Sequence, residues 1–266
     1  MKIQHTEKVL LKKDLLEIWS QPSVRALFLL VPLLCVVVLP ILALLFVTLL
    51  PLGFSENIEA FFKFLPENGS AYAAKGGLFQ VATARIFPIL FLAVPILISA
   101  AATASCFIGE QERGTMLPLL LTPVSVRRIA GMKLFVSLAL AILVTVLSFF
   151  LLLIVVTIGD ILLEIPFFIN AEWLITFFLL APLLAALSAL SVIHLSVRGQ
   201  RQGDAFRSST FLMFALILIY ILPFTGLYQL NISALLYFAI FLLCVVFVLF
   251  VSLPARFTAE KLTGKR

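Results

Sequence analysis

Six long apolar runs separated by polar segments dominate the pattern of this 266-residue chain. A helix needs about 20 residues to cross the hydrocarbon layer of a membrane, and four of the runs reach that length easily. The last two runs share one apolar block, whose interruption from Pro223 to Asn231 predicts a partly re-entrant hairpin on the outer side. The expected spans cover residues 26–50, 86–108, 134–158, 173–197, 210–222 and 232–253.

Composition supports an all-α integral membrane protein. Hydrophobic residues make up 63% of the chain and charged residues 12%, whereas soluble domains carry about a quarter charged residues. We therefore expect a six-span domain at 26–253, an N-terminal segment at 1–25 and a tail at 254–266. The first apolar run is too long for the core of a cleavable signal peptide. No disulfide framework is expected, because the three cysteines all lie within apolar runs.

The positive charges predict the orientation of the spans. Sixteen of the nineteen lysines and arginines lie in four segments, and cationic connections stay on the cytoplasmic side. Both chain ends and the long central loop should therefore be cytoplasmic, which six spans allow. The four segments are 1–25, 109–133, 198–209 and 254–266.

Two amphipathic stretches lie outside the expected spans. Within residues 1–25, a helical face predicts either an elbow helix in the membrane interface or a solvated arm. A similar spacing within the outer segment 51–85 predicts a small helix that rests on the outer leaflet or caps a dimer. The first face is made by Leu11, Leu15, Ile18 and Trp19, and the second by Ile58, Phe61, Phe62 and Leu65.

Small residues gather in two of the spans. Residues 99–105 read Ser-Ala-Ala-Ala-Thr-Ala-Ser, and the fourth span carries Ala181, Ala185, Ser188 and Ala189. Small side chains let helix backbones approach closely in lipid, so these stretches predict helix–helix contacts, with a pore lining as the alternative. Prolines at positions 32, 40, 88, 95 and 182 predict kinks.

The sequence offers no catalytic or metal-binding motif. Gly264-Lys265 lacks the remaining residues of a phosphate loop, and His5 and His194 have no companion ligand motif. Energy for transport would have to come from a partner or an ion gradient. His194 is the clearest ionisable residue inside a span, where it is either a polar substrate or proton site or a residue near the inner headgroups.

The loop at 109–133 is the most distinctive polar segment. Glu110, Glu112 and Arg113 precede Gly114, a flexible break, and Thr115 is suited to cap a helix start. Residues 116–121 predict a short apolar helix that includes Met116, Leu119 and Leu120 and ends at Thr122-Pro123. Ser125 is suited to cap the next helix, which continues through Arg127, Arg128 and Lys133 into the third span. This short helix either docks a partner or lies on the lipid surface.

This loop resembles the signature loop of bacterial ABC transporter permeases of the type-2 exporter superfamily. The resemblance extends to the start of the chain and to the six-span layout, although Leu117 stands where the family often has a glutamate. The matching residues are Glu110, Glu112, Arg113, Gly114 and Thr115, then Thr122, Pro123 and Ser125, then 131–133, with 12–15 and Pro22 near the start.

The resemblance implies a permease subunit with an elbow helix and a cytoplasmic coupling helix. Its partners would be a cytoplasmic ABC ATPase and a second permease, identical or similar, in the lipid of a bacterial plasma membrane. The chain would hold no cofactor and catalyse no reaction, because ATP and Mg²⁺ would bind to the partner ATPase. No nucleic-acid partner is implied.

Three other classes stay open from the residues alone. An ion-coupled carrier or channel would need paired ionisable groups at mid-membrane. A membrane enzyme would need a catalytic set, which the chain does not offer. A membrane scaffold for an ATPase would share the docking loop but would transport nothing.

Overall fold

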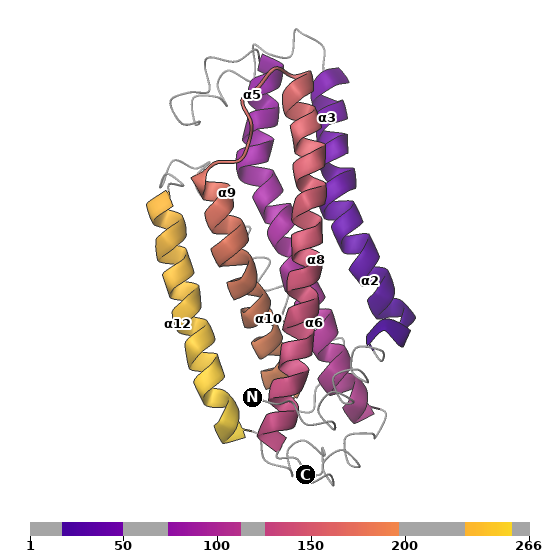
Figure 1. Ribbon diagram of the computed structural model, residues 1–266, viewed down its shortest axis with the longest axis vertical. Coiled ribbons are helices and arrows are strands. Elements are labelled where there is room, and N and C mark those ends of the chain that lie inside the picture. Colours follow the sequence, from indigo (N-terminus) through magenta and orange to yellow (C-terminus); the bar gives the residue numbers. More distant parts are fainter. Residues whose placement is uncertain (1–17, 50–73, 113–125, 197–231, 257–266) are drawn as a thin grey trace, which may run out of the picture.

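The computed structural model describes residues 18–49, 74–112, 126–196 and 232–256, and this part of the chain is almost entirely helical (Figure 1). Turns with π-helical hydrogen bonding, labelled η, interrupt three of the helices. The elements are α2 (Pro22–Pro32), η1 (Leu33–Val38), α3 (Leu39–Leu49), α5 (Ala74–Val81), η4 (Ala82–Ile86), α6 (Phe87–Glu112), α8 (Val126–Leu162), α9 (Ala171–Ile175), η5 (Thr176–Leu180), α10 (Ala181–Ser196) and α12 (Ile232–Arg256).

Joined end to end, these elements form five rods that are long and apolar enough to cross a membrane, counting the described residues alone. The chain is therefore a multi-pass membrane protein, and the all-α prediction is confirmed. The predicted span at 210–222 lies outside the described residues, as do residues 1–17 of the predicted elbow. The end of α10 and the start of α12 lie at opposite ends of the bundle, as a further crossing between them would require (Figure 1).

The helices extend beyond the apolar windows that predicted them. The first rod begins at Pro22 instead of residue 26, because Gln21 is extended and proline suits the first position of a helix. The helix of the second rod begins at Ala74, so residues 74–85 belong to that helix and not to the outer connection. α8 begins at Val126, directly after the predicted cap Ser125.

Each π turn lies immediately before a proline. A proline ring clashes with the carbonyl four residues earlier and offers no N–H, so a regular helix cannot pass through it undisturbed. The residue before each proline instead donates its N–H to the carbonyl five residues back, which widens the turn. These bonds run from Leu39 to Leu34, from Phe87 to Ala82 and from Ala181 to Thr176, ahead of Pro40, Pro88 and Pro182. The helices therefore accommodate these three prolines by π turns, whereas Pro32 and Pro95 lie inside α2 and α6.

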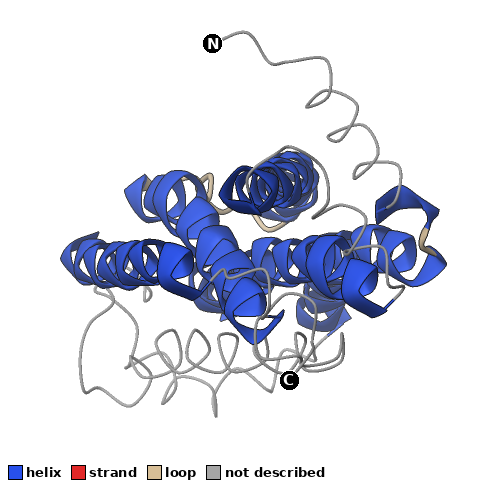
Figure 2. Ribbon diagram, turned by 90° about the horizontal axis from the view of Figure 1, so that it is seen from below, coloured by secondary structure: helices blue, strands red, loops and turns tan. Residues whose placement is uncertain are grey.

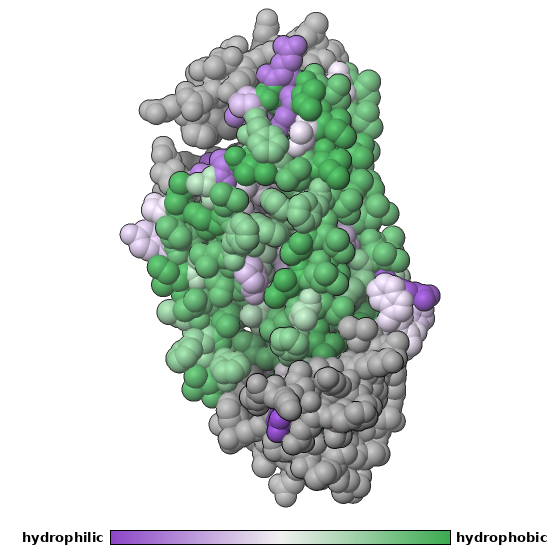
Figure 3. Space-filling view, in the orientation of Figure 1, coloured by the Kyte–Doolittle hydropathy of each residue, from purple (hydrophilic) through white to green (hydrophobic). Residues whose placement is uncertain are grey.

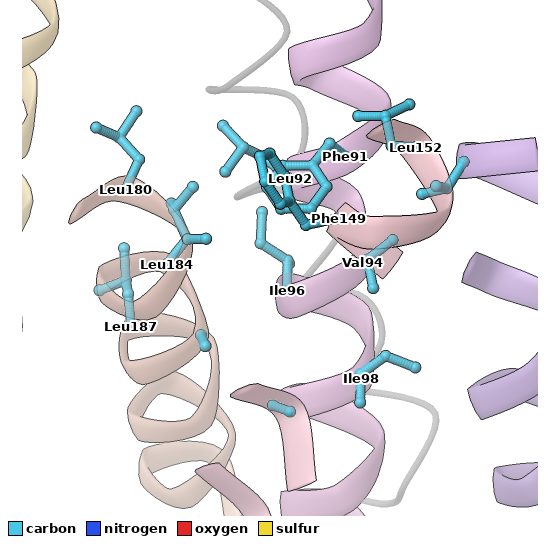
Figure 4. Packing of buried hydrophobic residues seen from close by; sticks show 14 of the residues in the cluster. Phe91, Leu92, Val94, Ile96, Ile98, Phe149, Leu152, Leu180, Leu184 and Leu187 are labelled. Atoms are coloured by element: carbon cyan, nitrogen blue, oxygen red, sulfur yellow. The ribbon is translucent and has the colours of Figure 1, made fainter. Parts of the chain in front are cut away.

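α6 is the central helix of the bundle, and the neighbouring rods pack around it (Figure 1). Figure 2 shows the same helices from below. Phe91, in the N-terminal half of α6, contacts the rings of Phe149 and Phe177. Those two rings stack on each other at 4.2 Å between centroids. Figure 4 shows Phe91 and Phe149 beside the aliphatic side chains that fill the space between α6, α8 and α10. α6 is therefore the helix through which any displacement would reach most of the bundle.

The outermost helices expose most of their apolar side chains. α12 buries one stripe, made by Leu235, Ala239 and Leu242, and leaves large residues such as Phe247 exposed. Apolar side chains cover the middle of the face seen in Figure 3. Such a surface is stable where lipid covers it, as expected for a membrane protein.

The small-residue stretches are helix–helix contacts, as predicted. All seven residues from 99 to 105 are buried within the single chain. The Ser188 hydroxyl on α10 donates to the carbonyl of Ile96 on α6 at 2.8 Å, and Thr103 on α6 donates to Ser137 on α8 at 3.0 Å. Close approach of the backbones is what makes these bonds possible.

Gly159 allows α8 to approach its neighbours, and its replacement should destabilise the bundle. A Cβ at this position would lie 2.5 Å from Cζ of Phe79, whose ring is fully buried. We expect Gly159→Ala to cost about 1–3 kcal/mol of stability, because the ring has to shift within a packed core. Gly131→Ala is the control on the same helix, since nothing lies within 4 Å of its added Cβ. Thermal unfolding in detergent measures both, and equal melting temperatures for the two variants would contradict the prediction.

Candidate functional site

The predicted coupling loop joins the ends of two long helices. Glu110 and Glu112 belong to the last turn of α6, and α8 begins at Val126. The other predicted loop residues lie outside the described part of the chain: Arg113, Gly114, Thr115, Met116, Leu119, Leu120, Thr122 and Pro123. The structure therefore describes the two helices that flank the loop, but not the predicted docking helix within it.

The two helices that flank the loop continue directly into the packed core. α6 runs without a break from Phe87 to Glu112 and α8 from Val126 to Leu162. The two helices pack against each other, and the Thr103–Ser137 hydrogen bond fixes their register toward the loop, at the end of the bundle that the charge pattern predicts to be cytoplasmic. A force applied to the loop would act directly on two helices of the packed bundle.

The side chain of Lys133 is buried, although the residue belongs to the cationic segment 109–133. The sequence placed it among the cations of a polar loop, but its side chain is only 1% exposed. It lies one helical turn before Ser137, inside the contact between α8 and α6. The side chain is buried because α8 is already packed against the bundle at this level.

His194 connects α10 and α12 near their C-terminal ends, which the charge pattern predicts to be cytoplasmic. Its Nδ1 lies 2.8 Å from the carbonyl oxygen of Leu190, which can only accept, so Nδ1 carries a proton. Its Nε2 lies 2.8 Å from the Ser252 hydroxyl. In the neutral ring Nε2 accepts from that hydroxyl. In the imidazolium Nε2 donates, and the hydroxyl turns to the carbonyl of Leu249 at 2.8 Å.

This pair should stabilise the contact between α10 and α12. We expect His194→Ala and Ser252→Ala each to cost about 0.5–1.5 kcal/mol, and the double variant to cost less than their sum, because both remove the same bond. Ser191→Ala is the control, since that hydroxyl bonds within α10 to the carbonyl of Ser188. Unfolding in detergent gives the coupling energy, and strict additivity of His194→Ala with Ser252→Ala would show that the bond contributes nothing.

A polar pocket was not predicted from the sequence; it lies where α8 ends and α9 begins, at the end of the bundle that the charge pattern predicts to be outer. Its volume is about 100 Å³, and α5, η4, α8, α9 and the 163–170 connection surround it. Polar side chains line it beside the aromatic rings of Phe167, Phe168 and Trp173. The polar lining residues are Gln80, Thr83, Asp160 and Asn170. The signal in the sequence was a lone aspartate at the end of a long apolar run.

Asp160 holds the connection that forms one wall of this pocket. Its carboxylate Oδ2 accepts the backbone N–H of Phe168 at 3.1 Å, and its carbonyl accepts that of Ile165 at 3.0 Å. Glu164, at φ 53°, takes the left-handed position that ends α8 in a Schellman motif. Asn170 then caps α9 by accepting the N–H of Trp173 at 3.1 Å. These bonds account for Asp160 and Asn170 as structural residues.

Charges of both signs lie at this outer end. Arg85 is close enough to Glu172 for the two to attract each other electrostatically. Amide, hydroxyl and carboxylate groups could bind water or a small polar molecule. Among the described residues, no three His, Cys, Asp or Glu side chains come together as a metal site, and none of the three cysteines forms a disulfide bond.

Comparisons with protein-family models, with curated proteins and with solved structures gave no match to this chain. Fold and hydropathy thus define the class, a multi-pass α-helical membrane protein.

Proposed function

We propose that this chain is the permease subunit of an ATP-driven ABC exporter in a bacterial plasma membrane. It forms the translocation pathway as a dimer with a second permease, identical or similar. Cytoplasmic ABC ATPases, which bind ATP and Mg²⁺, dock on the loop between α6 and α8. The resemblance of that loop to the signature loop of type-2 exporter permeases is the main support.

The framing of the loop by α6 and α8 supports the same proposal. A coupling segment has to transmit movement, and here it joins the central helix of the bundle to the longest one. ATP binding would favour the closed ATPase pair, and the spans would follow because the two equilibria are linked. Alternating access would then carry the substrate outward.

Affinity purification tests whether the partner exists. The tagged chain is extracted from its native cells into nanodiscs, and the eluate is examined by mass spectrometry and for ATP hydrolysis. We expect an ABC ATPase in the eluate, together with ATP hydrolysis above that of a mock purification. A second permease sequence in the same eluate would identify a heterodimer. The chain without an ATPase would contradict the proposal and favour an ion-coupled carrier, with His194 as the first residue to change.

A further inference from the structure

The polar pocket beside the 163–170 connection contains a buried carboxylate that keeps one oxygen available. Asp160 lines this pocket, and its side chain is only 4% exposed. Its Oδ2 accepts the backbone N–H of Phe168 at 3.1 Å, whereas no donor within the described part of the chain reaches Oδ1. A carboxylate removed from water is strongly unfavourable unless a cation or hydrogen bonds compensate it. The pocket therefore favours a positively charged donor beside Oδ1.

The other charged groups near this pocket do not supply that cation. Arg85 and Glu172 attract each other, and neither of them lines the pocket. Glu164 follows Asp160 in the same turn but is exposed and lies outside the lining. Among the described lining residues Asp160 is thus the charged one, and it makes the pocket negative.

The polar neighbours of Asp160 also suit a ligand that donates hydrogen bonds. The Thr83 hydroxyl already donates to the carbonyl of Phe79 at 2.9 Å, so its proton is committed. Any further bond of this hydroxyl oxygen has to be one that it accepts. Gln80 and Asn170 contribute amides, whose oxygens accept as well. The lining is therefore rich in acceptors.

Aromatic rings form the remaining wall of the pocket. Phe168 and Trp173 meet edge to face at 5.4 Å between centroids, and Phe167 lies 5.5 Å from Phe168. The face of an aromatic ring attracts cations, including those of organic ligands. One carboxylate beside such rings suits an organic cation better than a metal ion, which takes several oxygen ligands. The volume of about 100 Å³ has room for a few non-hydrogen atoms.

We infer that this pocket binds a primary ammonium group on a short carbon chain. The ammonium has three N–H donors, one for Oδ1 of Asp160 and the others for the neighbouring acceptors. Its carbon chain lies against the aromatic wall. Soluble amines and the ethanolamine headgroup of a membrane lipid both carry such a group. The inference does not depend on the proposed ATPase partner.

Titration calorimetry on the full chain in phosphatidylcholine nanodiscs tests this inference, with propylamine as the probe. Propylamine is a cation at neutral pH, as the lysine side chain is. We expect saturable binding of propylamine and none of propanol, which has the same chain without the charge. Propyltrimethylammonium keeps the charge but has no N–H donor and should bind more weakly. No propylamine binding, or equal binding of either analogue, would overturn the inference.

The lipid composition of the nanodisc distinguishes the two sources of the ammonium group. In phosphatidylethanolamine nanodiscs the lipid headgroup competes with the probe if it is the natural occupant. Weaker propylamine binding there would assign the pocket to the headgroup, and equal binding would assign it to a soluble amine.

Three variants locate the binding in this pocket. Asp160→Asn keeps an acceptor for the N–H of Phe168 but removes the charge, and should weaken propylamine binding about tenfold or more. Phe167→Leu removes an exposed ring of the aromatic wall and should weaken it about two- to fivefold. Glu164→Gln removes an acid outside the lining and should bind as the wild type does. Melting temperatures confirm that each variant is folded, and equal affinity in Asp160→Asn and Glu164→Gln would overturn the assignment to Asp160.

Discussion

In complex with the proposed ATPase, the Glu112→Ala, Arg113→Ala double variant is expected to leave ATP hydrolysis by that partner intact while the movement of the spans is largely lost. Glu112 is the last residue of α6, so its replacement leaves the packed length of that helix unchanged and the bundle should stay folded. The two changes remove the charged start of the predicted coupling loop. We expect the ATP-driven response of the spans to fall by about tenfold, a coupling loss within the range usual for linked sites.

Spin labels report this response without knowledge of the cargo. Leu162 at the outer end of α8 and Ile232 at the start of α12 are both exposed and suited to labelling. The distance between them is measured in nanodiscs before and after trapping with ATP and vanadate. Arg25→Ala is the control, because it removes an exposed cation at the same side of the membrane but outside the loop. A full response in the double variant would contradict the role given to the loop.

Asp160→Ala should destabilise the end of the bundle at which the 163–170 connection packs. The side chain is only 4% exposed, and its loss leaves the N–H of Phe168 without its acceptor. We expect a cost of about 1–3 kcal/mol, the penalty of a buried donor left unsatisfied. Thermal unfolding in detergent measures it.

Two further variants define the cause of that loss. Asp160→Asn keeps an acceptor oxygen and should retain most of the stability. Glu164→Gln changes an exposed acid in the same turn and should have little effect. Wild-type stability in Asp160→Ala would show that the carboxylate does not hold the 163–170 connection.

Span positions were predictable because a 20-residue apolar run is itself the physical requirement for crossing a membrane. The ends were less predictable, since helices continue past the hydrocarbon into polar sequence, as α8 does when it starts at Val126. The prolines predicted kinks, but the π turn before Pro40, Pro88 and Pro182 depends on hydrogen bonding that a sequence pattern does not specify.

The burial of polar side chains could not be predicted from the sequence, because it depends on how the helices pack. Lys133 reads as a loop cation in the sequence, and only the register of α8 against α6 places it inside the bundle. Asp160 likewise acquires its role from a backbone N–H eight residues later. The docking role of the loop rests on residues 113–123, all of which lie outside the described part, so that role stays a prediction.

Photo-cross-linking from the loop tests the central claim most directly. A photoreactive amino acid replaces Leu120 in the loop, and in a second chain Leu162 at the exposed outer end of α8. After irradiation in native membranes, we expect the Leu120 probe to join an ABC ATPase, identified by mass spectrometry, and the Leu162 probe not to. A Leu120 probe that reacts only with lipid would show that the short apolar helix lies on the membrane surface, and the permease account would fail.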